Sequence, residues 1–205
     1  MFALIHAEPF STVVKGSRFL GELLGAADHA AAKAVIAAQR LRYPDATHVV
    51  HALALGPTAA ILGCSDDGEP AGTAGRPVLE VLKGAALTDA VLTVTRWFGG
   101  TKLGTGGLVK AYTECAKGVI ASAQLREIVA MRQFQFLLPF PILEKGKRCF
   151  AETGFILTGE NYNAQGCFCS GTIPASAEAA FCQRLRDISK GAVDLTSGVD
   201  GEAEN

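Results

Sequence analysis

No run of apolar residues in this 205-residue chain approaches the roughly 20 that a helix needs to cross a bilayer. Residues 1–6 also lack the basic start and the hydrophobic length of a signal peptide. These two absences argue against a helical membrane protein and predict a soluble protein of the cytoplasm. At this length the chain can form one large domain or two small ones, each with its own core.

Cysteine spacings that bind metals are lacking too. The six cysteines form no C-x-x-C pair and no Cys/His pattern of a zinc site. Apolar residues make up 49% of the chain, so a core can form without disulfide bonds. Cys167 and Cys169 lie two residues apart, on one face of an expected strand. We interpret them as small buried residues rather than as a redox or metal pair.

An excess of positive charge is the third absence. The net charge is −1, whereas a protein that binds nucleic acid without sequence preference usually contains a clearly basic domain. Any contact with RNA must therefore depend on a local patch of Lys and Arg.

Glycine, in contrast, is concentrated at one place. Five glycines lie within residues 99–108, between an expected buried strand (90–97) and a helical pattern (108–123). A glycine inside a helix or strand costs about 1 kcal/mol relative to alanine. Five glycines so close together therefore indicate a backbone conformation that other residues cannot adopt. Glycines before a helix let N–H groups converge on an anion, which the helix dipole also favours. With Lys102 inside the loop and Arg96 before it, the segment predicts a phosphate site.

Two familiar phosphate loops do not fit this segment. A Walker A loop needs Lys-Ser or Lys-Thr after its closing glycine, but Thr105-Gly106 follow Gly104. A dinucleotide-binding loop beginning at Gly104 would need glycine or alanine where Val109 stands. The alternative to an anion site is a tight strand-to-helix turn without a ligand.

Residues 65–73 place three carboxylates, those of Asp66, Asp67 and Glu69, around Gly68. Such a group could bind Mg²⁺, could position Arg76 or Arg96, or could form a solvated turn. The sequence leaves these three interpretations open.

Two histidines and two aromatic residues are further candidates. The odd spacing of His48 and His51 places them on opposite faces of a strand, so they are a poor metal pair. His48 could act as a general base with Asp45 nearby, or as a hydrogen-bonded structural residue. Trp97 and Phe98 are neighbours at a strand end, so we expect at most one to be exposed for stacking on a base.

The pattern of elements predicts an α+β protein with two domains. In residues 1–131 strands alternate with helices, the first helix is capped by Asp28, and a hairpin turns at Gly56-Pro57. Residues 132–198 follow the order β-α-β-β-α-β of a ferredoxin-like domain. We expect its second helix to be capped by Ser176, its last strand at 192–195, and a disordered acidic tail at 199–205.

Four segments together resemble the YigZ/IMPACT family: Lys15-Gly16-Ser17-Arg18-Phe19, Asp45-Ala46-Thr47-His48, residues 65–77 and residues 95–112. The resemblance implies an N-terminal domain like the second domain of ribosomal protein S5, and a C-terminal domain like one of elongation factor G. Eukaryotic relatives regulate translation through a protein partner but carry a different accessory domain, whereas bacterial members are suspected of binding nucleic acid or the ribosome. One departure is Val49-Val50-His51, where members tend to show Asn-Cys-Tyr.

These observations lead to one hypothesis and two alternatives. The hypothesis is a non-enzymatic binding protein linked to translation that contacts the phosphates of RNA or of the ribosome. The alternatives are an enzyme or sensor that binds a phosphorylated metabolite or nucleotide at the same loop, and a module that only binds protein. No cofactor is expected, with Mg²⁺ as the one candidate, and no membrane partner.

The candidate site has two groups of residues. The residues expected to bind phosphate are Arg96, Gly99, Gly100, Lys102, Gly104, Gly106, Gly107 and Lys110. The residues expected to support them are Lys15, Arg18, Asp45, His48, Ser65, Asp66, Asp67, Glu69, Thr73 and Arg76.

Overall fold

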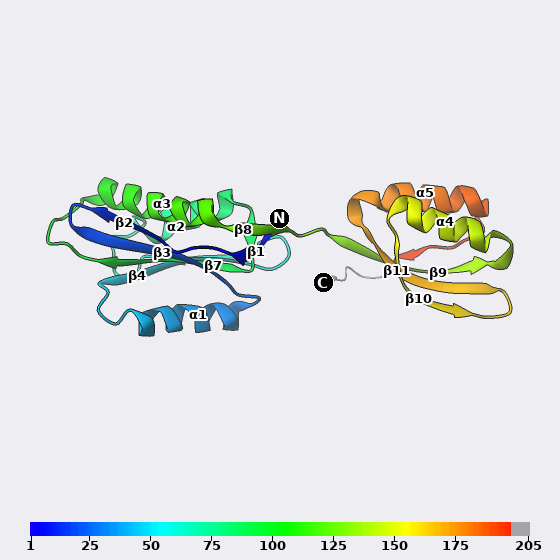
Figure 1. The fold of residues 1–205 in the computed structure, drawn as a ribbon, viewed down its shortest axis with the longest axis horizontal. Helices are drawn as coiled ribbons and strands as arrows, with labels where there is room; N and C mark the ends of the chain where they lie inside the picture. Colours follow the sequence, from blue (N-terminus) through cyan, green and yellow to red (C-terminus); the bar gives the residue numbers. More distant parts are fainter. Residues whose placement is uncertain (198–205) are drawn as a thin grey trace. The chain divides into compact units, whose positions relative to one another are not determined.

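The computed structural model describes residues 1–197, which form helices and three β-sheets in two compact units divided after Ile128 (Figure 1). The predicted α+β class is confirmed. The sequence places the division at 131, three residues further on. The predicted tail at 199–205 lies outside the described residues. In the described part of the chain, no helix combines the length and the apolar character needed to cross a membrane.

The N-terminal unit contains a five-stranded sheet in which every neighbouring pair is antiparallel. In spatial order its strands are β2 (Phe10–Val14), β3 (Ser17–Gly25), β7 (Ala90–Trp97), β4 (His48–Leu55) and β5 (Ile61–Ser65). Helices α2 (Gly75–Gly84) and α3 (Thr105–Ser122) cover one face, and α1 (His29–Arg42) covers the other (Figure 1). A smaller sheet combines β6 (Leu87–Thr88), β1 (Phe2–His6) and β8 (Gln124–Glu127).

Alternation along the strands divides the side chains between two cores. Val50 and Val94 pack with Tyr112 on the face covered by α2 and α3, whereas Leu53 and Val91 pack with Ala32 beneath α1. The predicted cap of α1 is confirmed, because Asp28 Oδ1 accepts a hydrogen bond of 2.7 Å from the N–H of Ala31. The strand predicted at 90–97 and the hairpin at Gly56-Pro57 are confirmed as well.

The strand directions bring the motif segments together. β3 and β4 begin at the end of the sheet where β5 and β7 finish, and both α2 and α3 begin there (Figure 1). Residues 15–17, 43–48, 65–75 and 97–105 therefore meet at this one end. We call it the motif end of the sheet.

The C-terminal unit is a four-stranded antiparallel sheet with two helices. Its spatial order is β10 (Ile156–Tyr162), β11 (Gly166–Pro174), β9 (Met131–Pro139) and β12 (Thr196–Ser197). Along the chain, α4 (Leu143–Thr153) follows β9 and α5 (Glu178–Ser189) follows β11, which confirms the predicted order β-α-β-β-α-β. Its core is rich in phenylalanine, with Phe155 and Phe181 stacked at 4.8 Å between ring centroids.

Cys167 and Cys169 are confirmed as small buried residues. Both are fully buried in the core of the C-terminal unit, and their sulfur atoms lie 3.7 Å apart. Burial, together with the neighbouring Cys167 thiol, raises the pKa of Cys169 to about 12. Cys169 is therefore a protonated thiol at neutral pH.

Two predictions for the C-terminal unit are wrong. Ser176 does not cap α5, because a 3₁₀ turn (Ala175–Ala177) follows Pro174 and the helix begins only at Glu178, without a side-chain cap. An N-cap needs extended backbone, which this turn removes. The last strand is β12 at 196–197 rather than 192–195, because the chain first leaves the helix through the left-handed residues Lys190 and Gly191.

Candidate functional site

A buried ion pair lies at the motif end of the sheet. Arg96 Nη1 donates to Glu69 Oε1 over 2.6 Å, and the two side chains are only 6% and 4% exposed. Tyr112 of α3 donates its hydroxyl hydrogen to the same oxygen over 2.7 Å, and Arg96 Nη2 donates to Ser17 Oγ over 3.3 Å. This cluster joins β7, β3, α3 and the 65–75 loop. Two of the three guanidinium nitrogens of Arg96 are thus engaged by the protein itself.

The environment of the cluster keeps Tyr112 neutral. Burial and the hydrogen bond to Glu69 raise the tyrosine pKa far above its ordinary value, so the hydroxyl remains a donor. His48 lies beside the cluster, with Nε2 3.9 Å from Glu69 Oε1 and Nδ1 2.8 Å from the carbonyl oxygen of Asp67. Asp45, which the sequence placed near His48, instead accepts a hydrogen bond from Trp97 Nε1 over 2.9 Å.

The acidic segment holds loops and a helix in place. Asp66 Oδ1 accepts from the N–H groups of Ala74 and Gly75 at the start of α2, and its Oδ2 accepts from Gly72. Asp67 Oδ2 accepts from the N–H of Val49 over 2.7 Å, and its Oδ1 pairs with Arg40.

The neighbouring hydroxyls serve the same purpose, since Ser65 Oγ accepts from the N–H of Asp67 and Thr73 Oγ1 donates to the Pro70 carbonyl. The carboxylates of Asp66, Asp67 and Glu69 therefore share no partner, and each binds its own set of groups. Throughout residues 1–197, no three His, Cys, Asp or Glu residues are grouped as a metal site. Arg96 is paired with Glu69, as one of the sequence interpretations has it, whereas Asp67 pairs with Arg40 rather than with Arg76 or Arg96.

Asp66→Ala tests the role of this carboxylate in starting α2. Burial raises the pKa of Asp66, but hydrogen bonds from three backbone N–H groups outweigh burial and hold it below the ordinary value. We expect the substitution to lower the free energy of unfolding by about 1–2 kcal/mol at pH 7. Because the folded-state pKa is depressed, the contribution is full above pH 3.8 and disappears as the pH falls through the folded-state value. Urea titrations at pH 7 and pH 3 check this, and an equal loss at both pH values would contradict it.

The glycine-rich loop packs backbone against backbone with the turn between β2 and β3. A Cβ on Gly99 would lie 1.9 Å from the carbonyl carbon of Gly16, which itself has a left-handed φ of +81°. Ser17 Oγ accepts from the N–H of Gly99 over 3.1 Å while also accepting from Arg96. The loop is thus tied to the buried cluster at its beginning.

The other end of the loop is open. Gly104 is the N-cap of α3, and no side chain in the described part of the chain caps the first-turn N–H groups. Gly106 adds no obstruction there, because a Cβ at this position would meet nothing within 4 Å. Lys102 and Lys110 are exposed, and Lys110 Nζ lies 3.9 Å from Glu114 Oε1.

Two aromatic residues complete this surface. Phe98 is 49% exposed and its ring lies 5.6 Å from the Arg96 guanidinium, whereas Trp97 is partly buried, so one of the two is exposed as expected. The guanidinium of Arg18 stacks on Trp97 at 3.7 Å. Because Phe19 packs against Tyr112 of α3, its strand neighbour Arg18 lies on the α1 side of the sheet. We call the group of Lys15, Phe98, the loop 99–107 and Lys110 the glycine-loop face.

Several residues that organise this end were not in the predicted site. Tyr112, Ser17 and Arg40 make the contacts described above, and Thr47 Oγ1 accepts from the N–H of Phe98 over 2.9 Å. Tyr112 follows the apolar spacing of α3, so its pattern indicates only a core residue. His51, the departure noted in the sequence, lies beneath α1, where burial and then Arg40 lower its pKa.

Residues 15–120, which contain every segment gathered at the motif end, match the model of the Impact N-terminal domain. The chain belongs to the IMPACT family. YigZ of Escherichia coli, an IMPACT family member, is 33% identical over 196 residues, which cover 94% of this chain and 96% of that protein. YvyE of Bacillus subtilis is 31% identical over 197 residues, covering 96% and 90%.

A further IMPACT family member, from Thermus thermophilus, is 34% identical over 181 residues, covering 87% of this chain and 97% of that protein. A crystal structure described as that of a hypothetical protein matches with a TM-score of 0.61 at 30% identity and covers 98% of both chains. Membership in the IMPACT family therefore applies to both units, and the resemblance found in the sequence is confirmed.

Proposed function

We propose that this IMPACT family protein binds the phosphate backbone of RNA, free or in the ribosome, through the glycine-loop face, and acts in translation in the cytoplasm without catalysing a reaction. The observation that carries this proposal is the uncapped start of α3. Asp28 caps α1, and Asp66 accepts from the first N–H groups of α2, whereas the first-turn N–H groups of α3, like those of α4 and α5, meet no capping side chain within residues 1–197. The start of α3 differs from those of α4 and α5 because it follows the exposed glycine loop at the motif end. An anion is the natural partner of such groups.

The charges around α3 support the same proposal. The acidic side chains at the motif end are engaged inside the protein, Asp67 by Arg40 and Glu69 by Arg96. Lys15 and Lys102 form no ion pair with any residue among 1–197. Their positive charges are available for phosphate oxygens. Phe98 adds an exposed ring on which a base can stack.

Exposure of the loop favours a polymer over a small metabolite. Gly99, Gly100 and Lys102 are all exposed, whereas sites for small ligands usually enclose most of the ligand surface. In this proposal phosphate is contacted by Lys102, Lys110, Lys15 and the N–H groups of α3. Arg18 stays stacked on Trp97 as a supporting residue. Arg96 lies buried beneath the loop and holds it in position through Ser17. His48 lies against Glu69 as a structural residue.

We also propose the finer fold assignments, an S5 domain 2-like N-terminal unit and a ferredoxin-like C-terminal unit. The second is supported by the spatial order β10-β11-β9-β12 combined with the chain order β-α-β-β-α-β. An experimental structure of the chain compared with both fold families tests these assignments.

Lys102→Ala tests the binding proposal. We expect the variant to bind a fluorescently labelled structured RNA several-fold more weakly, because one phosphate contact is lost. The slope of log affinity against log salt should also become shallower by about 0.7–0.9 per lost contact. Fluorescence anisotropy at several salt concentrations measures both quantities.

Lys33→Ala is the matched control, since Lys33 is exposed on α1, on the opposite face of the sheet. It should leave affinity and salt slope unchanged. Equal effects of Lys33→Ala and Lys102→Ala would mean that RNA binding depends on the net charge of the protein and not on the glycine-loop face. No binding by the wild-type protein at low salt would refute the proposal and leave phosphorylated metabolites or a protein partner as the function to test.

A further inference from the structure

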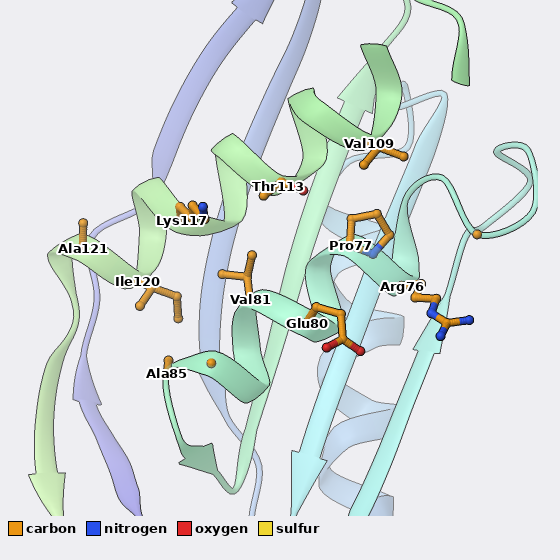
Figure 2. Close-up of a pocket in the computed structure, with 12 residues that line it drawn as sticks. Arg76, Pro77, Glu80, Val81, Ala85, Val109, Thr113, Lys117, Ile120 and Ala121 are labelled. Carbon is orange, nitrogen blue, oxygen red and sulfur yellow. The ribbon is translucent and has the colours of Figure 1, made fainter. Parts of the chain in front are cut away.

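An open groove runs between α2 and α3, on the outer surface of the N-terminal unit (Figure 2). Its volume is about 770 Å³. Val81 of α2 and Ile120 of α3 point into the space between the helices, and Pro77, Ala85 and Val109 also line it (Figure 2). Most of the lining is therefore apolar. Val109 is 39% exposed, whereas Val81, Ala85 and Ile120 are partly buried and also pack against the core. The groove therefore presents a partly exposed apolar surface.

The shape of the groove suits an extended, rod-like occupant. Its lining on α3 extends from Val109 to Ala121, which corresponds to about 18 Å along a helix. Small residues line one end of the groove, namely Gly84 at the end of α2, Ala85 directly after it and Ala121 on α3. A third helix of about three turns would fill this length and bury its apolar face against both helices.

The charges of the groove indicate which residues should flank the apolar face of the occupying helix. Arg76 lies at the start of α2, and Lys117 lies on α3 about one turn before Ala121, so the groove has one cation toward each end. Across the described residues neither cation has an ion-pair partner. The carboxylate in the lining, Glu80, is already paired with Lys83 over 3.2 Å. An occupant with carboxylates at both ends of its apolar face would complement these cations.

We propose that the α2–α3 groove docks an amphipathic helix of a partner protein, with acidic residues flanking an apolar face spaced i, i+3, i+4 and i+7. This inference does not depend on RNA binding at the glycine-loop face. RNA is a poor occupant because the groove lining is mostly apolar and contains no aromatic residue on which a base could stack. A second copy of the chain is a poor occupant as well, because groove against groove would place like charges together.

The test uses two synthetic helical peptides of about 14 residues with the same leucine face. One carries Glu at both flanks and the other carries Lys at the same positions. We expect the full chain to bind the Glu-flanked peptide about tenfold more tightly in fluorescence anisotropy, because two ion pairs form in place of two repulsions. Backbone amide chemical-shift changes should fall on α2 and α3.

Charge reversal gives the sharper result. Arg76→Glu combined with Lys117→Glu should reverse the preference, so that the Lys-flanked peptide binds more tightly. Ala121→Trp should weaken both peptides at least tenfold, because the exposed alanine lines one end of the groove and a large ring fills it. Lys33→Glu, on α1, should change neither. Thermal unfolding checks that each variant is folded.

Any of four results would overturn the proposal. The first is equal affinity for the two peptides, which would mean that peptides bind the groove nonspecifically. The second is chemical-shift change outside α2 and α3, and the third is peptide binding unaffected by Ala121→Trp. The fourth is concentration-dependent dimerisation of the wild-type chain that Ala121→Trp abolishes, which would make a second copy the occupant.

Discussion

Glu69→Ala should destabilise the N-terminal unit by about 3–5 kcal/mol, the cost of removing one member of a buried ion pair. Arg96 would keep its charge at 5% exposure, and Tyr112 would lose the acceptor of its hydroxyl hydrogen. The protein contains one tryptophan, Trp97, and it lies in this unit. Urea unfolding followed by tryptophan fluorescence therefore reports on the N-terminal unit.

Two further variants separate charge from hydrogen bonding in the cluster. Tyr112→Phe should cost only about 1–2 kcal/mol, because it removes one hydrogen bond and leaves the ion pair intact. Glu69→Ala combined with Arg96→Met should be more stable than Glu69→Ala alone, because no uncompensated charge remains buried. If all three variants unfolded at the wild-type urea concentration, the cluster would contribute nothing to stability.

The local elements of this chain were predictable because each depends on neighbouring residues. Apolar runs identified β7, the cap at Asp28 identified the start of α1, and the C-terminal order of elements followed from alternating patterns. Ser176 failed as a cap because the turn after Pro174 moved the N-cap position of α5 from Ser176 to Ala177. The sequence shows a serine that can cap a helix, but the backbone conformation around this serine could not be predicted from the sequence.

Contacts between distant segments could not be predicted in the same way. Asp67 pairs with Arg40, 27 residues away on α1, although Arg76 and Arg96 are equally plausible partners by composition. The strand order and direction decide which segments meet, and these follow from long-range packing. The groove between α2 and α3 likewise depends on how two helices lie on the sheet. Its apolar residues look like core positions when they are read along the sequence.

Gly99→Ala should destabilise the N-terminal unit by about 3 kcal/mol or more, the upper end of what overpacking costs. Its Cβ would lie 1.9 Å from the carbonyl carbon and 2.1 Å from the carbonyl oxygen of Gly16. These atoms belong to backbone held in the β2–β3 turn, so a flexible side chain cannot move aside. The loop would have to leave the turn, and Ser17 Oγ would lose the N–H of Gly99.

Gly106→Ala is the matched control from the same loop. A Cβ there meets nothing within 4 Å, and the residue lies in the first turn of α3, where alanine is favoured over glycine by up to about 1 kcal/mol. We therefore expect the urea midpoint, followed by Trp97 fluorescence, to fall in Gly99→Ala. In Gly106→Ala the midpoint should stay unchanged or rise. A similar loss in both variants would mean that the loop needs flexible backbone throughout. A wild-type midpoint for Gly99→Ala would mean that the contact with Gly16 does not hold the loop, and that the open start of α3 is positioned by the buried Arg96–Glu69 cluster alone.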